Sequence, residues 1–193
     1  MARIGAEERR QDFIEATIKV IAEHGIANAT TRRIATAADS PLASLHYVFH
    51  TKDELFYAVY ESLINMPQQS LQHAPAGATA GESVAEMLRQ LVKWFTAHPE
   101  LATTQFELFF WNLRNNPDMA AKIYAVSIEA TQQAIHKVIG AALDQTALTT
   151  VSRLLINLFD GLLLAWSAHG DRERLESETE TACHAVKLLV SSY

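Results

Sequence analysis

The chain has 193 residues, of which 49% are hydrophobic and 20% charged, the balance of an ordinary globular protein. Without an apolar run near the roughly 20 residues of a bilayer span, a signal-type segment or a second cysteine, we expect a cytoplasmic protein. The net charge of −6 speaks against a generic nucleic-acid binder. Residues 1–50, however, carry six basic and six acidic side chains, so composition leaves DNA binding open.

Apolar residues recur at intervals of three and four through most of the chain, which predicts an all-α fold of about nine helices. Thr30 is a candidate N-cap, Ser40-Pro41 resembles a cap followed by a first-turn proline, and Thr51 with Glu54 has capping-box spacing. The four helices expected in the N-terminal third cover residues 7–24, 31–38, 41–48 and 51–66.

The segment at 66–81 is rich in Pro, Gly, Gln and Ala, which indicates a helix end followed by a loop. It divides the expected N-terminal domain, 1–50, and its connecting helix, 51–66, from a C-terminal domain at 67–193. The helices expected in the C-terminal domain cover residues 82–97, 99–114, 117–140, 149–168 and 172–191.

The two short helices at 31–38 and 41–48 follow a longer helix and are separated by a turn, the layout of a helix-turn-helix. Packing residues are expected at Ile34, Ala38, Leu45 and Phe49. The opposite side of the second helix then presents five residues outward: Leu42, Ala43, Ser44, His46 and Tyr47. Small residues at 43 and 44 would let this helix enter a major groove about 12 Å wide.

Residues 30–55, TTRRIATAADSPLASLHYVFHTKDEL, closely resemble the DNA-binding signature of the TetR family, and the similarity extends over about 9–60. The usual form is T-x-x-x-I-A-x-x-A-G-V-S, then a small residue, Leu, an aromatic pair, Phe and Ser/Thr-Lys-Asp/Glu-x-Leu. This chain has Asp39 at the usual glycine, Ser40-Pro41 at the usual Val-Ser, and Ala43 where glycine is frequent. Asp tolerates a left-handed turn, so the departures bear on the operator sequence more than on the fold.

The resemblance implies a DNA-binding role for residues of the second, third and fourth helices. Thr31 and Arg33 would meet the DNA backbone, and Lys52 would add a phosphate contact beside a helix N-terminus. The residues implied to face the bases are Leu42, Ala43, Ser44 and Tyr47, with His46 and Tyr47 also near phosphates. Arg9 and Arg10 are further candidates for backbone contacts.

Ordinary surface roles compete with these assignments when the residues are taken one at a time. Arg32-Arg33 alone would be a solvated face, and Tyr47 alone could belong to a core. His46 and His50 have helical spacing but no evident third ligand, so we expect no metal site and no cofactor. Only the arrangement within one pattern favours DNA binding.

Large side chains gather in three successive helices of the C-terminal domain, as in the lining of an apolar ligand pocket, although a helix core uses the same residue types. The candidate contacts for a small-molecule effector are Trp94, Phe106, Phe110, Trp111 and Tyr124, with Glu107 as a polar anchor.

Residues 154–166, LLINLFDGLLLAW, resemble the penultimate helix of BetI-type members of the TetR family, and Asp160 interrupts this apolar stretch. The resemblance implies that the last two helices pack against their copies in a homodimer. The candidate interface residues are Leu155, Leu158, Leu162, Trp166, Ala182, Val186 and Leu189. Cys183 is expected to pack there too.

The chain shows no nucleophile–base pair, phosphate-binding Gly-rich loop or zincin motif, so we expect no catalytic residues and no enzyme. The function predicted is a TetR-like regulator, a repressor released from a palindromic operator by a small molecule. The alternative is a helical small-molecule-binding protein or enzyme without DNA binding.

Overall fold

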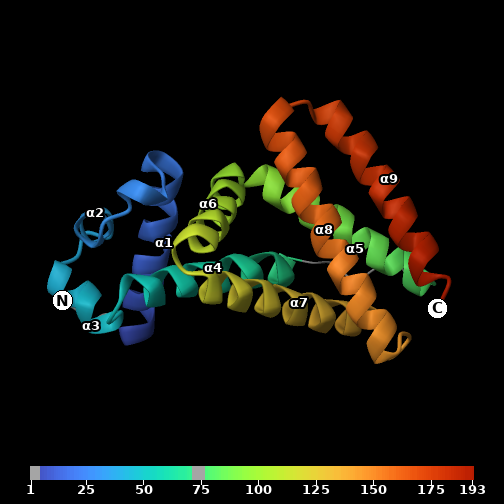
Figure 1. The fold of residues 1–193 in the computed structure, drawn as a ribbon, viewed down its shortest axis with the longest axis horizontal. Coiled ribbons are helices and arrows are strands. Elements are labelled where there is room, and N and C mark those ends of the chain that lie inside the picture. The colour runs from blue at the N-terminus through green and yellow to red at the C-terminus, as the bar shows by residue number, and fades with distance from the viewer. Residues whose placement is uncertain (1–4, 71–76) are drawn as a thin grey trace. The chain divides into compact units, whose positions relative to one another are not determined.

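The computed structural model describes the backbone of residues 5–70 and 77–193, with the side chains of 5–65 and 77–193. The described residues form nine α-helices and one 3-10 turn, and none of them lies in a strand (Figure 1). The all-α prediction is confirmed. The chain divides into two compact units, the described parts of Met1–Asn65 with Pro99–Ile123 and of Met66–His98 with Tyr124–Tyr193.

The first unit combines the N-terminal helices with a later helix of the chain. It holds α1 (Ala6–His24), η1 (Ile26–Asn28), α2 (Thr31–Ala37), α3 (Leu42–Val48), the first part of α4 (Lys52–Ser70), α6 (Pro99–Asn115) and the start of α7 (Pro117–Ile139). Helix α1 packs against α2, α3 and α6. Its predicted apolar side, with Phe13 and Ile21 fully buried, forms the centre of this unit.

Local hydrogen bonds set the starts of these helices. The Thr30 hydroxyl accepts from the Arg33 N–H at 3.2 Å, which confirms the predicted cap of α2. Thr51 accepts from the Glu54 N–H at 3.0 Å, but the Glu54 carboxylate accepts from the His50 N–H instead of completing the predicted box. Helix α3 begins at Leu42, with Pro41 as N-cap, one residue later than predicted.

The turn between α2 and α3 contains the left-handed residue anticipated from the sequence. Asp39 has φ 46°, the one positive φ of a non-glycine residue in the part of the chain that is described. The Ser40 N–H donates to the Ala35 carbonyl at 2.9 Å and closes the turn. Asp39 therefore adopts the left-handed conformation that glycine usually adopts at this position of the signature, because its short polar side chain tolerates this conformation.

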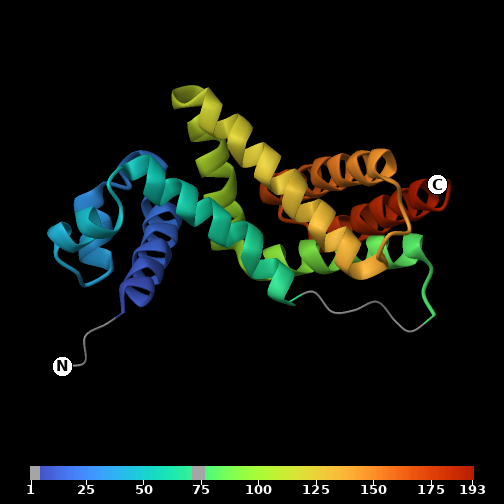
Figure 2. The same ribbon diagram turned by 90° about the horizontal axis from the view of Figure 1, so that it is seen from below.

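The second unit consists of α5 (Ala80–Ala97), the later part of α7, α8 (Gln145–His169) and α9 (Arg172–Val190). Helix α9 packs along α5 and α8, and the three lie side by side in both ribbon views (Figures 1 and 2). Asp144 accepts from the Ala147 N–H at 2.8 Å, so α8 begins four residues before the predicted 149. Helix α4 continues to Ser70, past the expected end, and residues 71–76 of the predicted loop lie outside the described residues.

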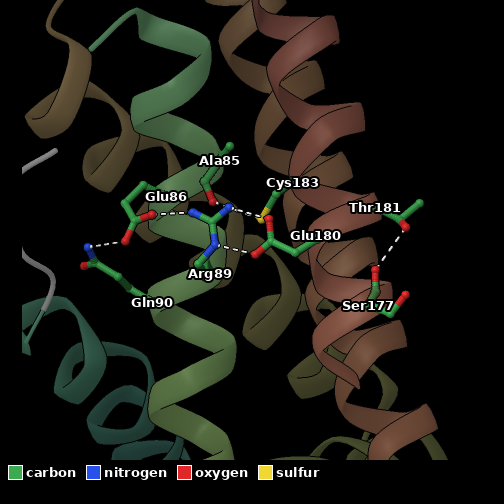
Figure 3. Close-up of polar contacts among 8 residues, drawn as sticks. All are labelled: Ala85, Glu86, Arg89, Gln90, Ser177, Glu180, Thr181 and Cys183. Carbon is green, nitrogen blue, oxygen red and sulfur yellow. Dashed lines mark hydrogen bonds and ion pairs between the residues drawn. The ribbon is translucent and has the colours of Figure 1, made fainter. Parts of the chain in front are cut away.

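Two ion pairs join α5 to α9, and Figure 3 shows the one between Arg89 and Glu180. The Arg89 guanidinium donates to both carboxylate oxygens of Glu180, at 2.7 and 2.8 Å, and also contacts Glu86. Two turns away, the Lys187 ammonium lies 2.7 Å from Glu82. Two-oxygen pairing orients a guanidinium more strictly than a single contact does, so this seam has a defined geometry.

The backbones of α5 and α9 also approach closely beside these pairs. A Cβ at Gly81 would lie 2.7 Å from the Lys187 carbonyl oxygen, so only glycine fits here. The Cys183 thiol donates to the Ala85 carbonyl at 3.3 Å, and burial raises the pKa of Cys183 to about 11. Thiolate is the reactive form of cysteine; this buried thiol therefore stays protonated and unreactive at neutral pH.

Helix α8 differs from the sequence expectation in one respect. Its 25 residues are long and apolar enough for a membrane span by length and composition. Its apolar side, including Val151, Leu155 and Leu163, is buried in the core of the second unit. Of the apolar window in α8, 44% is buried, so packing in the core accounts for part of its composition.

Candidate DNA-binding surface and effector site

Helix α3 has one buried and one open side. Leu45 is buried, and Phe49, just after the helix, is buried with it. On the open side Tyr47 is 82% exposed, and the small Ala43 is exposed near the helix start. A large aromatic side chain so open to water contributes nothing to the core, and such residues commonly mark a binding surface.

The other predicted DNA contacts surround this helix. We use "DNA-facing surface" for the set Thr31, Arg33, Leu42, Ala43, Ser44, His46 and Tyr47. Arg33, His46 and Tyr47 are exposed, and Thr31, Leu42 and Ser44 are partly buried. None of the set is fully buried, as contact with DNA requires.

Arg33 lies at the start of α2, where helix N–H groups also point outward. Its guanidinium donates to the Asn28 carbonyl at 3.2 Å, and its own N–H is capped by Thr30. The Asn28 amide in turn donates to the His24 carbonyl at 2.8 Å. Arg33 is thus held by the turn that precedes α2, while its side chain stays exposed.

Lys52 and Arg10, two other predicted phosphate contacts, lie against aromatic rings. The Lys52 ammonium is 4.7 Å from the Phe56 ring centre and 5.6 Å from that of Trp111. Burial lowers the pKa of Lys52, and the charge of Asp53 opposes this effect. The Arg10 guanidinium lies 5.5 Å from the Phe49 ring centre. Cation–π contact with a ring holds each charge at the protein.

The six predicted effector contacts are divided between the two units. Trp94 and Tyr124 belong to the second unit, where Trp94 stacks on His98 at 4.5 Å between ring centres. The other four, Phe106, Glu107, Phe110 and Trp111, belong to α6 of the first unit. Phe106 and Phe110 stack at 6.4 Å, and Phe110 is 52% exposed.

Glu107 has a partner within its own unit that sequence reasoning did not foresee. Its carboxylate accepts a hydrogen bond from the Ile26 N–H, 81 residues away in the sequence. This bond explains the residue structurally. No local signal could have found it, since it depends on how α6 packs on η1.

The predicted dimer residues fall into two groups. Four of them, Leu155, Leu162, Ala182 and Val186, are buried in the protomer's own core. Leu158, Trp166 and Leu189 are only partly buried. Packing among α5, α8 and α9 leaves the first four little surface for a partner, and the predicted interface itself stays a prediction. Leu164 and Leu188, which are not among the seven predicted residues, are 43% and 58% exposed.

The described residues contain no group of three His, Cys, Asp or Glu side chains placed to hold a metal. Among the carboxylates of α8 and α9, Asp160 stands out because burial raises its pKa to about 6.

Comparison with known proteins decides the family. Residues 13–59 match the model of the bacterial regulatory proteins of the tetR family. Over 86% of its length the chain is 32% identical to the HTH-type nicotine-responsive transcriptional repressor HdnoR of Paenarthrobacter nicotinovorans, of which the match covers 87%. The chain belongs to the TetR family. It is a helix-turn-helix transcriptional regulator that binds DNA, and not an enzyme.

Solved TetR-type structures agree with this assignment. The multidrug binding protein EbrR in complex with ethidium has a TM-score of 0.67 and 25% identity, with 92% of this chain and 97% of that chain covered. A TetR transcriptional regulator from Rhodococcus sp. RHA1 has a TM-score of 0.72 at 20% identity, with 94% and 97% covered. The TetR-family fold therefore extends well beyond the N-terminal signature.

Proposed function

We propose that this TetR-family protein is a cytoplasmic homodimeric repressor, which inserts α3 into the major groove of a palindromic operator and leaves it when a small organic effector binds. The observation that carries the proposal is the open side of α3, where Tyr47 is 82% exposed next to the small residue Ala43. HdnoR is itself a repressor. The expected division into 1–50, the connecting helix 51–66 and 67–193 describes the functional parts.

Few side chains of the DNA-facing surface can form two hydrogen bonds with the edge of one base. Ala43, Leu42 and Tyr47 suit apolar contacts to thymine methyl groups, and Arg33 suits a phosphate. We propose that specificity depends on such contacts and on DNA shape. Half-sites about one helical turn apart follow from a two-fold symmetric dimer.

We propose an effector with a flat aromatic ring system. HdnoR is nicotine-responsive, and EbrR forms a complex with ethidium. Nicotine and ethidium are both nitrogen-containing aromatic compounds. The aromatic candidates here, which suit stacking, are Trp94, Phe106, Phe110, Trp111 and Tyr124. Glu107 is left out because its carboxylate already binds Ile26. A BetI-type C-terminal domain is part of this proposal and rests on residues 154–166; a BetI of Rhizobium meliloti is 30% identical over 46% of the chain.

For the homodimer we propose an interface on the outer sides of α8 and α9. Leu158, Trp166 and Leu189 keep part of their surface free, and Leu164 and Leu188 are exposed. Large exposed apolar side chains on two neighbouring helices are typical of a protein interface. The buried residues beneath them support this surface without touching the partner.

The proposal is tested by selecting bound duplexes from a random DNA pool with the full chain. We expect enrichment of an imperfect palindrome, whose complex with the protein is then titrated with nicotine and ethidium as probes. Enrichment without two-fold symmetry would contradict the dimeric binding mode. Failure of both probes to release the duplex would contradict the effector class while leaving DNA binding intact.

A further inference from the structure

We propose that Glu107 is a positioning residue for DNA binding: through the Ile26 N–H it fixes the turn that holds Arg33 in place for a DNA phosphate. The inference rests on the proposed phosphate contact of Arg33. It gives Glu107, on α6 outside the helix-turn-helix, a part in operator binding.

The first link is the bond between Glu107 and the backbone of η1. The carboxylate accepts from the Ile26 N–H, and hydrogen bonds to a charged acceptor are stronger than neutral ones. Gly25 has φ 75°, and a Cβ there would lie 3.6 and 3.9 Å from the two carboxylate oxygens. The turn therefore packs directly against Glu107.

The second link leads from η1 to Arg33. Ile26 begins the 3-10 turn and Asn28 ends it, and the bond from the Ala29 N–H to the Ile26 carbonyl, at 3.1 Å, closes this turn. The Asn28 carbonyl accepts from the Arg33 guanidinium at 3.2 Å. A single short turn thus separates the Glu107 contact from the exposed arginine head.

Helix α6 itself is fixed on α1 next to this contact. Thr104 is fully buried where α6 packs on α1: its hydroxyl donates to the Glu100 carbonyl of its own helix at 2.8 Å and lies 3.4 Å from the Ile18 carbonyl of α1. Glu107 follows one turn later on α6, which packs on both α1 and η1. An arginine held before it meets DNA loses less side-chain entropy on binding.

The test is a double-mutant cycle on Glu107 and Arg33, with affinity for the selected operator duplex measured by fluorescence anisotropy at several salt concentrations. R33A should weaken binding about five- to tenfold and lower the salt slope by about one. E107A should reproduce much of both effects, and the double variant should bind no more weakly than R33A. E107Q keeps an acceptor for the Ile26 N–H and should restore most of the affinity.

Thr104→Val is the matched control, because it removes a buried hydroxyl from the same helix but none of the hydrogen bonds that lead from Glu107 to Arg33. It should lower the melting temperature and leave operator affinity and salt slope unchanged. If E107A does not fold, Glu107→Met takes its place, since it keeps the volume without the acceptor. No effect of R33A would remove the proposed phosphate contact. A normal R33A loss with an unchanged or fully additive E107A would overturn the positioning role alone.

Discussion

The ammonium nitrogen of Lys52 lies 5.6 Å from the centre of the Trp111 ring, within the same unit. Lys52 is a proposed DNA contact and Trp111 a proposed effector contact, so two residues assigned to different sites meet directly. Phe56 supplies the second ring, at 4.7 Å. The contact holds the lysine charge against α6, where burial already lowers its pKa.

Trp111→Leu removes one of the two rings against which the Lys52 ammonium lies. We expect stronger operator binding, because less cation–π contact is then lost when this ammonium moves to a phosphate. With a cation–π contact of about 1 kcal/mol, affinity should rise about fivefold at low salt. The Lys52→Ala variant should bind weakly whether or not Trp111 is present. Anisotropy titrations of the two single variants and the double variant test this; an equal gain from W111L in the K52A background would contradict it.

Tyr47→Ala should weaken operator binding by about tenfold, roughly the loss of one good contact at a base or phosphate. Stability should be unchanged, because the side chain is 82% exposed. Leu45→Ala on the same helix is the matched control. It removes a side chain that is 1% exposed and should cost about 2 to 5 kcal/mol of unfolding free energy. Thermal melts beside DNA titrations separate the two outcomes, and unchanged affinity of Y47A would remove α3 from the DNA interface.

Neighbouring substitutions on α9 should have opposite consequences. Leu188→Glu places a charge on a side chain that is 58% exposed, so we expect a folded monomer in sedimentation equilibrium. Val186→Glu places it in the core, where Val186 is 1% exposed, and should unfold or aggregate the chain because a buried unpaired charge is costly. A wild-type chain that sediments as a monomer, or a fully dimeric L188E, would argue against an interface on this side of α9.

Asp160 should make the free energy of unfolding fall as pH rises. An ion-paired carboxylate, whose pKa is lowered in the folded chain, has the opposite effect. The pKa of Asp160 is raised from 3.8 to about 6 in the folded chain, so the folded state keeps the proton longer than the unfolded state does. Stability therefore falls as pH rises from about 4 to about 6 and then stays low. At about 1.4 kcal/mol per pKa unit, the full loss is at most about 3 kcal/mol.

Asp160→Asn removes this titration and should be more stable than the wild type at pH 8, with the difference vanishing near pH 4. Denaturant titrations at both pH values measure it. A constant difference between the two proteins across this range would show that Asp160 does not titrate as described.

Local chemistry made most helices predictable from the sequence, and long-range packing made some assignments wrong. Thr30 and Asp144 each start a helix by accepting a hydrogen bond from a backbone N–H three residues later, although only the first cap was anticipated. The helical spacing of Ala182, Val186 and Leu189 could be seen in the sequence. This spacing is the same whether the apolar side of a helix packs in its own core or against a partner. Leu188 does not share this spacing. Its exposure could be known only once the packing of α9 on α5 and α8 was known.

The candidate site shows the same limit. The open side of α3 followed from the spacing of Leu45 and Tyr47, which fixes opposite sides of a short helix. The association of α6 with α1 did not follow from any pattern in the sequence. Glu107 is reassigned for that reason.

The ion pairs between α5 and α9 also determine how far one helix can slide along the other. Glu82 and Arg89 are spaced by seven residues on one helix, as Glu180 and Lys187 are on the other, and the helices run antiparallel. A slip of one turn separates both pairs. A slip of two turns brings Arg89 opposite Lys187, or in the other direction Glu82 opposite Glu180, so like charges meet. The charge sequence thus favours one register of α5 against α9, and salt that screens these exposed pairs should weaken this preference.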